Sequence, residues 1–183
     1  MDQEYQRVFT PEPIITFRSA RKLSSYLVRA KLYPLERTVD SCKCYGKRCE
    51  VCDNVAETST FTSTATQNTY KINHHLNCSE KCLVYLLTCN KCFKQYVGQT
   101  VDEFRRRWNN YKSNDRKFQR LEPCMQEHLF SHFSMAGHDG FLNDVSITFI
   151  DKTDPSDPLR REDYWRQTLK TLVPYGLNIE DSV

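Results

Sequence analysis

The stretch Lys81–Tyr111, KCLVYLLTCNKCFKQYVGQTVDEFRRRWNNY, contains the pattern that decides the fold of this 183-residue chain. It opens with the apolar run Leu83–Leu87, which is too short for a helix and is typical of a buried strand. The pair Cys89 and Cys92, separated by two residues, marks a turn, and a second strand-like run follows at Tyr96–Gly98. The pattern therefore predicts two adjacent strands joined by a turn that carries cysteines.

A helical pattern follows the second strand and covers Val101–Tyr111. Asp102 and Glu103 are expected in its first turn, where the helix dipole favours negative charge. Between residues 101 and 125 the chain has seven Lys/Arg against four Asp/Glu, with aromatic residues among them. Such a run is usually a solvated surface, although it is also suited to holding phosphates.

Three more elements are expected further along the chain. Val145–Ile150 alternates polar and apolar residues and predicts a third strand. A helix is expected over Pro123–Gly137, and its apolar stripe is Met125, Leu129 and Phe133. The last helix is expected over Pro158–Leu172, with Asp157 as its cap. Its candidate core residues are Leu159, Tyr164, Leu169 and Leu172.

The segment at residues 53–69 holds eight Ser/Thr and predicts a loop that contributes nothing to the core. A short strand is expected within Tyr70–Leu76, where the chain enters the central unit.

Composition narrows the class of protein. The formal net charge of +3 permits a nucleic-acid partner without requiring one. No apolar run approaches the length of a membrane span, so no membrane partner is expected. The first residues, MDQEYQRVF, lack the core of a signal peptide, and we therefore expect an intracellular protein.

Nine cysteines are many for a chain of this length, and they predict either disulfides or metal sites. The odd count and the short spacings favour metal in a reducing compartment. Cys49 and Cys52 have the spacing of a metal-binding knuckle, and Cys44 lies close before them. Cys42 precedes these three cysteines, so four cysteines fall within eleven residues.

Val84-Tyr85 and Tyr96-Val97-Gly98, about ten residues apart, resemble the two half-motifs of the GIY-YIG nucleases. Leu83 stands where the family usually has glycine. The Cys-x-x-Cys between the half-motifs resembles the branch found in Penelope-like retroelements, as do the later stretches HFSMAGH and REDYWRQTLKTLVPYGLN. The resemblance covers roughly residues 44–178. It implies an α/β (α+β) fold with a small three-stranded antiparallel sheet, flanking helices and structural zinc sites.

The resemblance also implies a catalytic site for DNA phosphodiester hydrolysis with one divalent metal, Mg²⁺ or Mn²⁺. Glu162 matches the metal-binding glutamate of the family, with its neighbour Asp163 as the alternative. Tyr85 and Tyr96 would position or deprotonate the attacking water, and the sequence does not distinguish which is the base. Two more residues complete the implied catalytic set, Arg107 on the scissile phosphate and Tyr111 one helical turn later.

Three basic residues beside that site are candidates for contacts to DNA phosphates: Arg105, Arg106 and Lys112. Because three arginines are consecutive, the choice of Arg107 as the catalytic one rests on the position of Tyr111, one turn further on. The sequence alone leaves the assignment of the catalytic arginine open by one residue among these three arginines.

The nuclease branch implies two structural Zn²⁺ sites. One would combine Cys89 and Cys92 with two histidines, His132 and His138, and His128 is the alternative member. The other would combine Cys44, Cys49 and Cys52 with Cys78, because the branch has a cysteine just before the first strand. Substitutes for that fourth ligand are Cys42, Cys82, His74 and His75. Four protein ligands close a zinc shell, so both sites are expected to be structural.

Three regions are expected along the chain. Residues 1–40 form a basic arm with a short helix, which resembles the connector between reverse transcriptase and nuclease in Penelope-like elements. Residues 41–80 form the Cys-rich zinc-binding segment with its Ser/Thr-rich loop, and residues 81–180 form the nuclease domain.

Two functions are compatible with these features. The first is an endonuclease of Penelope-like origin that nicks DNA in the nucleus for target-primed reverse transcription, with a reverse transcriptase domain and its RNA as partners in a longer polyprotein. The second is a catalytically inactive, zinc-bound nucleic-acid-binding module. A disulfide-rich secreted protein is a weaker third interpretation. The joint presence of Tyr85, Tyr96, Arg107 and Glu162 favours the first.

Overall fold

The structure, a computed structural model, describes residues 39–180. The basic arm expected at residues 1–40 lies outside these residues, apart from its last two. Within the described part, no helix is long and apolar enough to cross a membrane.

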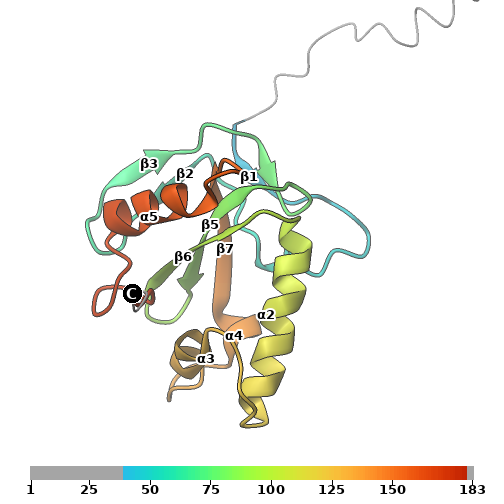
Figure 1. The fold of residues 1–183 in the computed structure, drawn as a ribbon, viewed down its shortest axis with the longest axis vertical. Helices are drawn as coiled ribbons and strands as arrows, with labels where there is room; N and C mark the ends of the chain where they lie inside the picture. The colour runs from blue at the N-terminus through green and yellow to red at the C-terminus, as the bar shows by residue number, and fades with distance from the viewer. Residues whose placement is uncertain (1–38, 181–183) are drawn as a thin grey trace, which may run out of the picture. The chain divides into compact units, whose positions relative to one another are not determined.

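A three-stranded antiparallel sheet forms the centre of the described domain. Its strands are β5 (Leu83–Cys89), β6 (Gln95–Thr100) and β7 (Val145–Lys152), in the order β6-β5-β7. In the view of Figure 1 the sheet lies between α5 and α2. Six of the seven residues of β5 are buried, which fits its continuous apolar sequence and its central position. The predicted three strands and their antiparallel pairing are confirmed.

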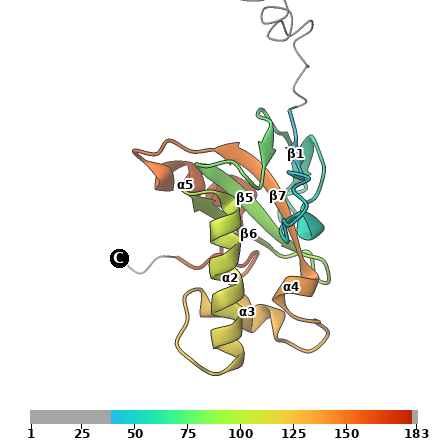
Figure 2. The same ribbon diagram turned by 90° about the vertical axis from the view of Figure 1, so that its right-hand side faces the viewer.

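Helix α2 (Phe104–Gln119) packs its aromatic residues against the sheet. Phe104, Trp108 and Tyr111 are buried and follow one another at helical spacing, so they lie on one face. The Phe104 ring meets the Tyr85 ring edge-on, with 4.7 Å between centroids. Two short helices, α3 (Glu127–Phe133) and α4 (Phe141–Asp144), lie beside the C-terminal half of α2, as Figure 2 shows.

The start of α2 differs from the sequence prediction. The helix begins at Phe104, so Asp102 and Glu103 precede its first turn instead of occupying it. The helix also continues eight residues beyond Tyr111, to Gln119. The polar residues after Tyr111 extend the helix because its exposed face needs no apolar residues once the other face is packed.

The helix expected over Pro123–Gly137 is shorter than predicted. The helix that forms is α3, which begins at Glu127. It cannot begin earlier because Gln126 has a left-handed backbone, with φ 58°. Met125 therefore lies outside the helix and is 68% exposed, whereas Leu129 and Phe133 are buried as expected.

The last helix, α5 (Pro158–Leu169), begins where the sequence predicted and ends three residues earlier. Its cap is confirmed, because the Asp157 carboxylate accepts a hydrogen bond from the Arg160 backbone N–H at 3.3 Å. Its predicted core face is wrong in part: Leu159 and Tyr164 are 60% and 50% exposed. The residues of α5 that are buried are Glu162, Trp165 and Leu169.

The residues before the central sheet form four short strands and add a few side chains to the hydrophobic core. β1 (Ser41–Cys42) pairs in parallel with β4 (Leu76–Asn77), and β2 (Thr60–Thr62) pairs with β3 (Thr69–Lys71). A short 3-10 helix, η2 (Cys52–Asn54), follows the Cys-rich loop. The prediction that residues 53–69 add nothing to the core is wrong, since the side chains of Val55 and Phe61 are buried.

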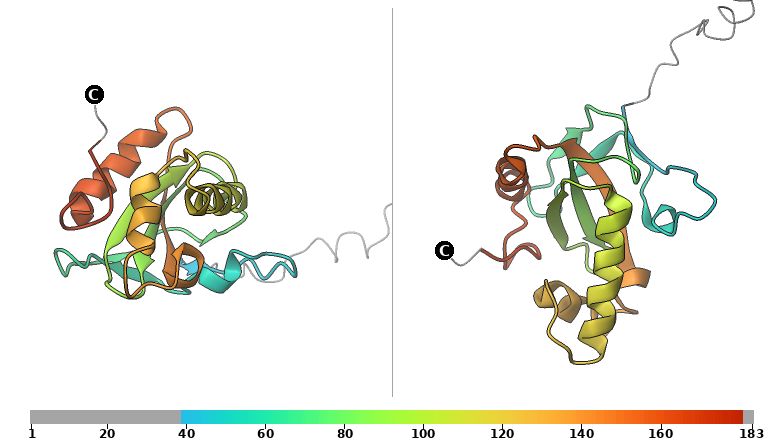
Figure 3. Two further views of the ribbon diagram at one scale, coloured as in Figure 1. Left: turned by 90° about the horizontal axis from the view of Figure 1, so that it is seen from below. Right: turned by 45° about the vertical axis from the view of Figure 1, so that its right-hand side comes forward.

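The loop that carries Cys44, Cys49 and Cys52 lies beside the N-terminal half of α2, as the views of Figure 3 show. There Lys112 of α2 donates to the carboxylate of Glu50. The Cys-rich segment is therefore tied to the same helix that packs on the sheet.

Candidate active site

The hairpin of β5 and β6 places two tyrosines on one face of the sheet. Tyr85 is opposite Gly98 and Tyr96 is opposite Leu87 in the strand register. Because directly opposed residues share a face and alternate residues of a strand share a face, Tyr85 and Tyr96 project to the same side. Both side chains are buried, with 0% and 6% of their surface exposed.

Helix α2 adds a cation and a third phenol to that face. The Tyr85 and Tyr111 hydroxyls are 2.9 Å apart and share a hydrogen bond. Arg107 donates from its Nε to the Tyr85 hydroxyl at 3.1 Å, and its guanidinium lies 5.0 Å from the centre of the Tyr111 ring. The helix thus brings one arginine of the consecutive three to the tyrosines.

Gly98 makes room for the Tyr85 ring. A Cβ atom at residue 98 would lie 2.7 Å from both the Cζ and the hydroxyl of Tyr85. Such contacts are shorter than side chains tolerate, so any larger residue would displace the phenol. The structure thus gives a steric reason for glycine at residue 98.

Helix α5 brings a carboxylate toward the same residues. Glu162 is buried, with 8% of its surface exposed, and its Oε1 lies 3.9 Å from the Nε of Arg166 one turn later. The negative charge of Glu162 raises the pKa of Tyr85 and of Tyr96, so the carboxylate acts on both phenols. Its neighbour Asp163 points outward, with 62% of its side chain exposed.

These five residues, Tyr85, Tyr96, Arg107, Tyr111 and Glu162, are called the tyrosine site below. Burial is the largest influence on the pKa of its three phenols and raises each of them. Arg107 opposes this by lowering the pKa of all three phenols. The phenols are therefore protonated at neutral pH, and each can donate a hydrogen bond.

Asp151, which the sequence analysis did not select, fixes α5 to the sheet. Its Oδ2 accepts hydrogen bonds from Arg161 Nε at 2.5 Å and from Trp165 Nε1 at 2.8 Å. Both donors are on α5 and flank Glu162 in the sequence, so Asp151 positions the first half of that helix. The available signal was a carboxylate at the end of a buried strand, a position that polar residues rarely occupy without partners.

The C-terminal residues complete the edge of β6. Asn178 is fully buried, and its side-chain amide accepts from the Val97 N–H and donates to the Val97 carbonyl, both at 2.8 Å. Leu177 donates its N–H to the carbonyl of Gln95, also at 2.8 Å. Edge strands expose unpaired backbone groups, and this tail satisfies those beside Tyr96.

The other basic residues proposed for phosphate contacts lie apart from the tyrosines. Arg105 and Arg106 are exposed; Arg105 donates to the Ser79 hydroxyl, and Arg106 lies 3.6 Å from the Asp102 carboxylate. Lys112 is held by Glu50, so a phosphate would have to compete with that carboxylate.

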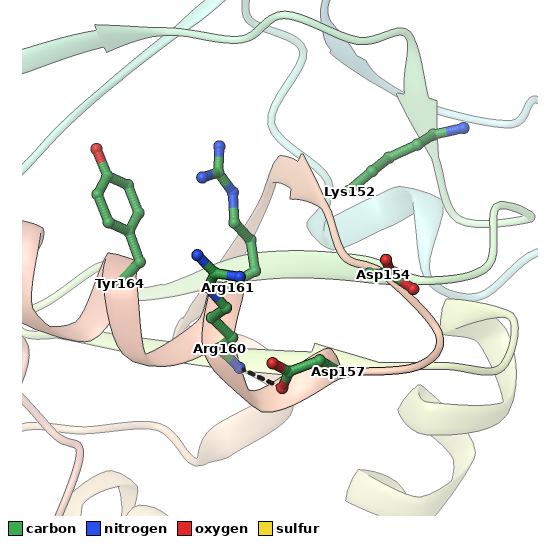
Figure 4. A pocket seen from close by; sticks show the side chains of 6 residues that line it. All are labelled: Lys152, Asp154, Asp157, Arg160, Arg161 and Tyr164. Carbon is green, nitrogen blue, oxygen red and sulfur yellow. Dashed lines mark hydrogen bonds between the residues drawn. The ribbon is translucent and has the colours of Figure 1, made fainter.

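A groove of about 360 Å³ lies at the N-terminal end of α5. Figure 4 shows the six residues that line it: Lys152, Asp154, Asp157, Arg160, Arg161 and Tyr164. Three of these side chains are cationic, and the guanidinium of Arg161 lies 4.9 Å from the centre of the Tyr164 ring. Cations beside an exposed aromatic ring are features of sites for a nucleic-acid strand, although two of the six lining residues are carboxylates.

Cys89, Cys92, His132 and His138, the Cys/His cluster, are brought together at the β5–β6 turn and the end of α3. Their ligand atoms lie within 4.8 Å of one another. Cys92 Sγ is 3.3 Å from His132 Nε2, and the two histidine rings have centroids 4.7 Å apart. Both ring nitrogens of His138 are buried without a hydrogen-bond partner. A metal ion would supply the partner that such a nitrogen needs.

Cys44, Cys49, Cys52 and Cys78, the four-cysteine cluster, join the Cys-rich loop to the residues just before β5. Three Sγ–Sγ distances lie between 3.3 and 3.6 Å, those of Cys44–Cys52, Cys49–Cys78 and Cys52–Cys78. A disulfide would require about 2.05 Å, whereas two thiolates on one zinc lie about 3.8 Å apart. The donor set therefore fits Zn²⁺ better than a disulfide.

The alternative ligands weighed from the sequence are placed elsewhere. The His128 ring lies beside the Tyr96 ring in a tilted arrangement, with 6.3 Å between ring centroids, and is not in the Cys/His cluster. Cys82 and His74 join neither cluster, and Cys42 and His75 form a separate group with Asp40.

Comparison with known proteins agrees with this arrangement. Residues 81–176 match the family model described as the GIY-YIG catalytic domain. No curated protein and no solved structure matches the chain. The match covers more than half of the sequence, so the domain is of the class of nuclease catalytic domains. The chain belongs to the GIY-YIG family.

Proposed function

We propose that this protein is a DNA endonuclease that hydrolyses one phosphodiester bond with the aid of a divalent metal. The observation that carries the proposal is the group formed by Arg107, Tyr85 and Tyr111, in which one guanidinium and two phenols interact within 3.1 Å. Glu162, on another helix, acts electrostatically on Tyr85 and on Tyr96. A cation, hydroxyl donors and a carboxylate are what phosphodiester hydrolysis requires.

Glu162 is the residue that would hold the metal. It is buried, which strengthens the attraction of a carboxylate for a cation, and Mg²⁺ commonly takes one or two protein carboxylates. A divalent ion at that carboxylate would polarise the scissile phosphate and lower the pKa of a bound water. Asp163 is exposed and directed away, which favours Glu162 over the alternative.

Arg107 would bind a non-bridging oxygen of the scissile phosphate. Its guanidinium is already oriented by the Tyr85 hydroxyl and the Tyr111 ring, so little side-chain entropy is lost when a phosphate binds. The added negative charge of the transition state would strengthen this contact more than that of the ground state.

Tyr85 and Tyr96 would orient the attacking water. Burial keeps their pKa above the usual range for a phenol, so neither removes a proton at neutral pH without further positive charge. When substrate and metal are bound, the phenol with more cationic neighbours has the lower pKa and is the better base. Arg107 donates directly to Tyr85, which favours Tyr85 for that role.

Both cysteine-containing clusters would hold structural Zn²⁺. Each offers four protein ligands, which closes a tetrahedral shell and leaves no position for substrate. The Cys/His cluster would fasten the β5–β6 turn to α3, and the four-cysteine cluster would fasten the Cys-rich loop to the start of β5.

For the biological setting we propose a Penelope-like retroelement origin. The Cys-x-x-Cys in the β5–β6 turn and the histidines of HFSMAGH support it, because they form one cluster in this chain. In that setting the protein would nick nuclear DNA for target-primed reverse transcription, beside a reverse transcriptase domain and its RNA.

A second function, an inactive nucleic-acid-binding module, is favoured by one observation. The Tyr85 side chain is completely buried and its hydroxyl already has two partners, Tyr111 and Arg107. Catalysis by Tyr85 therefore requires substrate to reach a group that is satisfied in the free protein.

A plasmid-nicking assay separates the two functions. The zinc-loaded protein is mixed with supercoiled DNA and Mg²⁺ or Mn²⁺, beside Glu162→Ala and the matched control Asp163→Ala. We expect the wild type and Asp163→Ala to convert supercoiled to nicked DNA, and Glu162→Ala to bind DNA without cutting it. Retained binding without cutting by the wild type would establish the inactive module, and cutting by Glu162→Ala would show that the metal lies elsewhere.

A further inference from the structure

A third group of metal-binding side chains lies outside both clusters described above. Asp40, Cys42 and His75 place one ligand atom each within 4.8 Å of one another. The His75 Nδ1 is 3.0 Å from Asp40 Oδ1 and 3.9 Å from Cys42 Sγ. Ligand atoms on one tetrahedral zinc are separated by about 3.3–3.8 Å, so these side chains are close to the required spacing.

Backbone pairing holds the three residues in place. Ser41 pairs with Leu76 in the parallel pair of β1 and β4, and the Leu76 N–H donates to the Asp40 carbonyl at 2.8 Å. Ser41 is fully buried, and its hydroxyl accepts from the backbone N–H of Phe149 in the central sheet at 3.0 Å. Sites built on paired strands hold their side chains more accurately than sites on loops.

Strand alternation explains why the side chains converge. Because successive residues of a strand point to opposite faces, a buried Ser41 directs Asp40 and Cys42 to the other face together. His75 reaches that face from the residue before β4. All three side chains are half-buried, so solvent and ions can reach them.

The group is independent of the four-cysteine cluster. That cluster has its full set of four thiols without Cys42. Cys42 and Cys44, two residues apart, therefore belong to different groups. The third group thus includes Cys42, which the four-cysteine cluster does not use.

We propose that Asp40, Cys42 and His75 form a third metal site, which binds Zn²⁺ through three protein ligands and leaves the fourth position open. The thiol selects a borderline or soft divalent ion over Mg²⁺ or Ca²⁺. Three protein ligands with an open position are the arrangement that admits water or a small anionic ligand to zinc. Since the shell is incomplete, this site binds zinc more weakly than the two four-ligand clusters.

Zinc counting tests the site in the full chain. The wild type, Cys42→Ser and His75→Gln are equilibrated in a zinc buffer of fixed free Zn²⁺, separated from unbound metal and analysed by mass spectrometry. The matched control is His74→Gln, which removes the neighbouring histidine outside the group. We expect Cys42→Ser and His75→Gln each to hold one zinc ion fewer than the wild type and the control.

Cobalt substitution gives a second measurement that does not depend on the total count. Each cysteine bound to Co²⁺ adds thiolate-to-metal absorption, and the proposed site has a single thiolate. Cys42→Ser should lose that contribution at the last, weakest step of a Co²⁺ titration, with unchanged circular dichroism. The proposal is overturned if Cys42→Ser and His75→Gln bind as much zinc as the wild type and titrate with cobalt identically.

Discussion

The tyrosine site is built on the strands of the β5–β6 hairpin, whereas the Cys/His cluster is built on its turn. On the strands, alternation directs Tyr85 and Tyr96 to one face, where helices α2 and α5 add their residues. At the turn, the Phe93 N–H donates to the Cys89 carbonyl at 2.9 Å, and this reversal brings Cys89 and Cys92 close together. Under the proposed function, one hairpin would supply both a site for chemistry and an anchor for the fold.

The two sites also differ in how their polar atoms are satisfied. In the tyrosine site the hydroxyl of Tyr85 has hydrogen-bond partners from α2 in the free protein. In the Cys/His cluster both ring nitrogens of His138 are buried without a hydrogen-bond partner. A metal ion would supply the partners that the ring nitrogens of His138 lack. Substitutions in the cluster should therefore affect stability first, and substitutions in the tyrosine site should affect cleavage first.

The largest expected effect is on stability, from Cys92→Ser. Loss of a structural zinc ligand should lower the free energy of unfolding by about 4 kcal/mol or more, since metal loss is among the few causes of such large changes. Urea denaturation of the zinc-loaded proteins measures it. Cys124→Ser, a cysteine outside the three metal-binding groups of the described chain, is the control and should change stability by much less. Equal stability of Cys92→Ser and wild type would remove the cluster's proposed role.

Arg107→Ala should slow cleavage strongly with little loss of stability. Removing one preorganised donor to a developing negative charge typically slows the reaction by about 10²–10³-fold. Single-turnover cleavage at saturating DNA measures this loss. Arg106→Ala removes the exposed neighbouring charge and should slow cleavage only a few-fold. If Arg106→Ala is the slower variant, the assignment within the three arginines is wrong.

Gly98→Ala should affect both properties, because the residue lies between the strand and the catalytic phenol. The added methyl group forces the Tyr85 ring to move, and overpacking of this kind costs about 1–3 kcal/mol. Unfolding and cleavage are measured together. In a background of Tyr85→Ala the stability cost of Gly98→Ala should disappear, and a cost that persists would place the clash elsewhere.

Tyr96→Phe should have the smallest effect on stability, visible as a change in its dependence on alkaline pH. Burial raises the pKa of Tyr96 in the folded protein, so above the unfolded pKa near 10 the unfolded chain loses a proton that the folded chain keeps. Stability is therefore fully present below that pH and falls above it, by up to about 1.4 kcal/mol per pH unit for this group. Tyr96→Phe should show a shallower decline in urea unfolding between pH 10 and 11. An identical decline would mean that Tyr96 is not buried in solution.

Periodicity and short motifs were sufficient to predict the central sheet. The apolar run of β5 and the alternation of β7 each predicted a strand that the structure contains. The site residues on these strands follow from the same pattern, because strand register fixes which residues share a face.

The faces of the helices were harder to predict. In α5 the sequence favoured Leu159 and Tyr164 as core residues, but the buried stripe runs through Glu162, Trp165 and Leu169. A buried glutamate does not fit an apolar stripe, so hydrophobic periodicity predicted Leu169 correctly but placed Leu159 and Tyr164 in the core wrongly. The contacts of Asp151 with α5, which settle the orientation of that helix, join residues on separate elements and leave no local signal.

The predicted start of the helix at Pro123–Gly137 was wrong for a local reason. Gln126 adopts a left-handed conformation, which glycine and asparagine favour. A glutamine gives no sequence signal for this conformation. Met125 therefore precedes the helix and is exposed, so it is not part of the apolar stripe.

The central claim is that cleavage depends on a divalent ion at the tyrosine site while zinc serves only the fold. The most direct test measures the single-turnover cleavage rate of the zinc-loaded protein over a Mg²⁺ titration, with bound zinc counted before and after. We predict no cleavage without added Mg²⁺, a rate that saturates with Mg²⁺, and an unchanged zinc content. Cleavage by the zinc-loaded protein without Mg²⁺ or Mn²⁺, or a rate that follows the zinc content, would contradict the account.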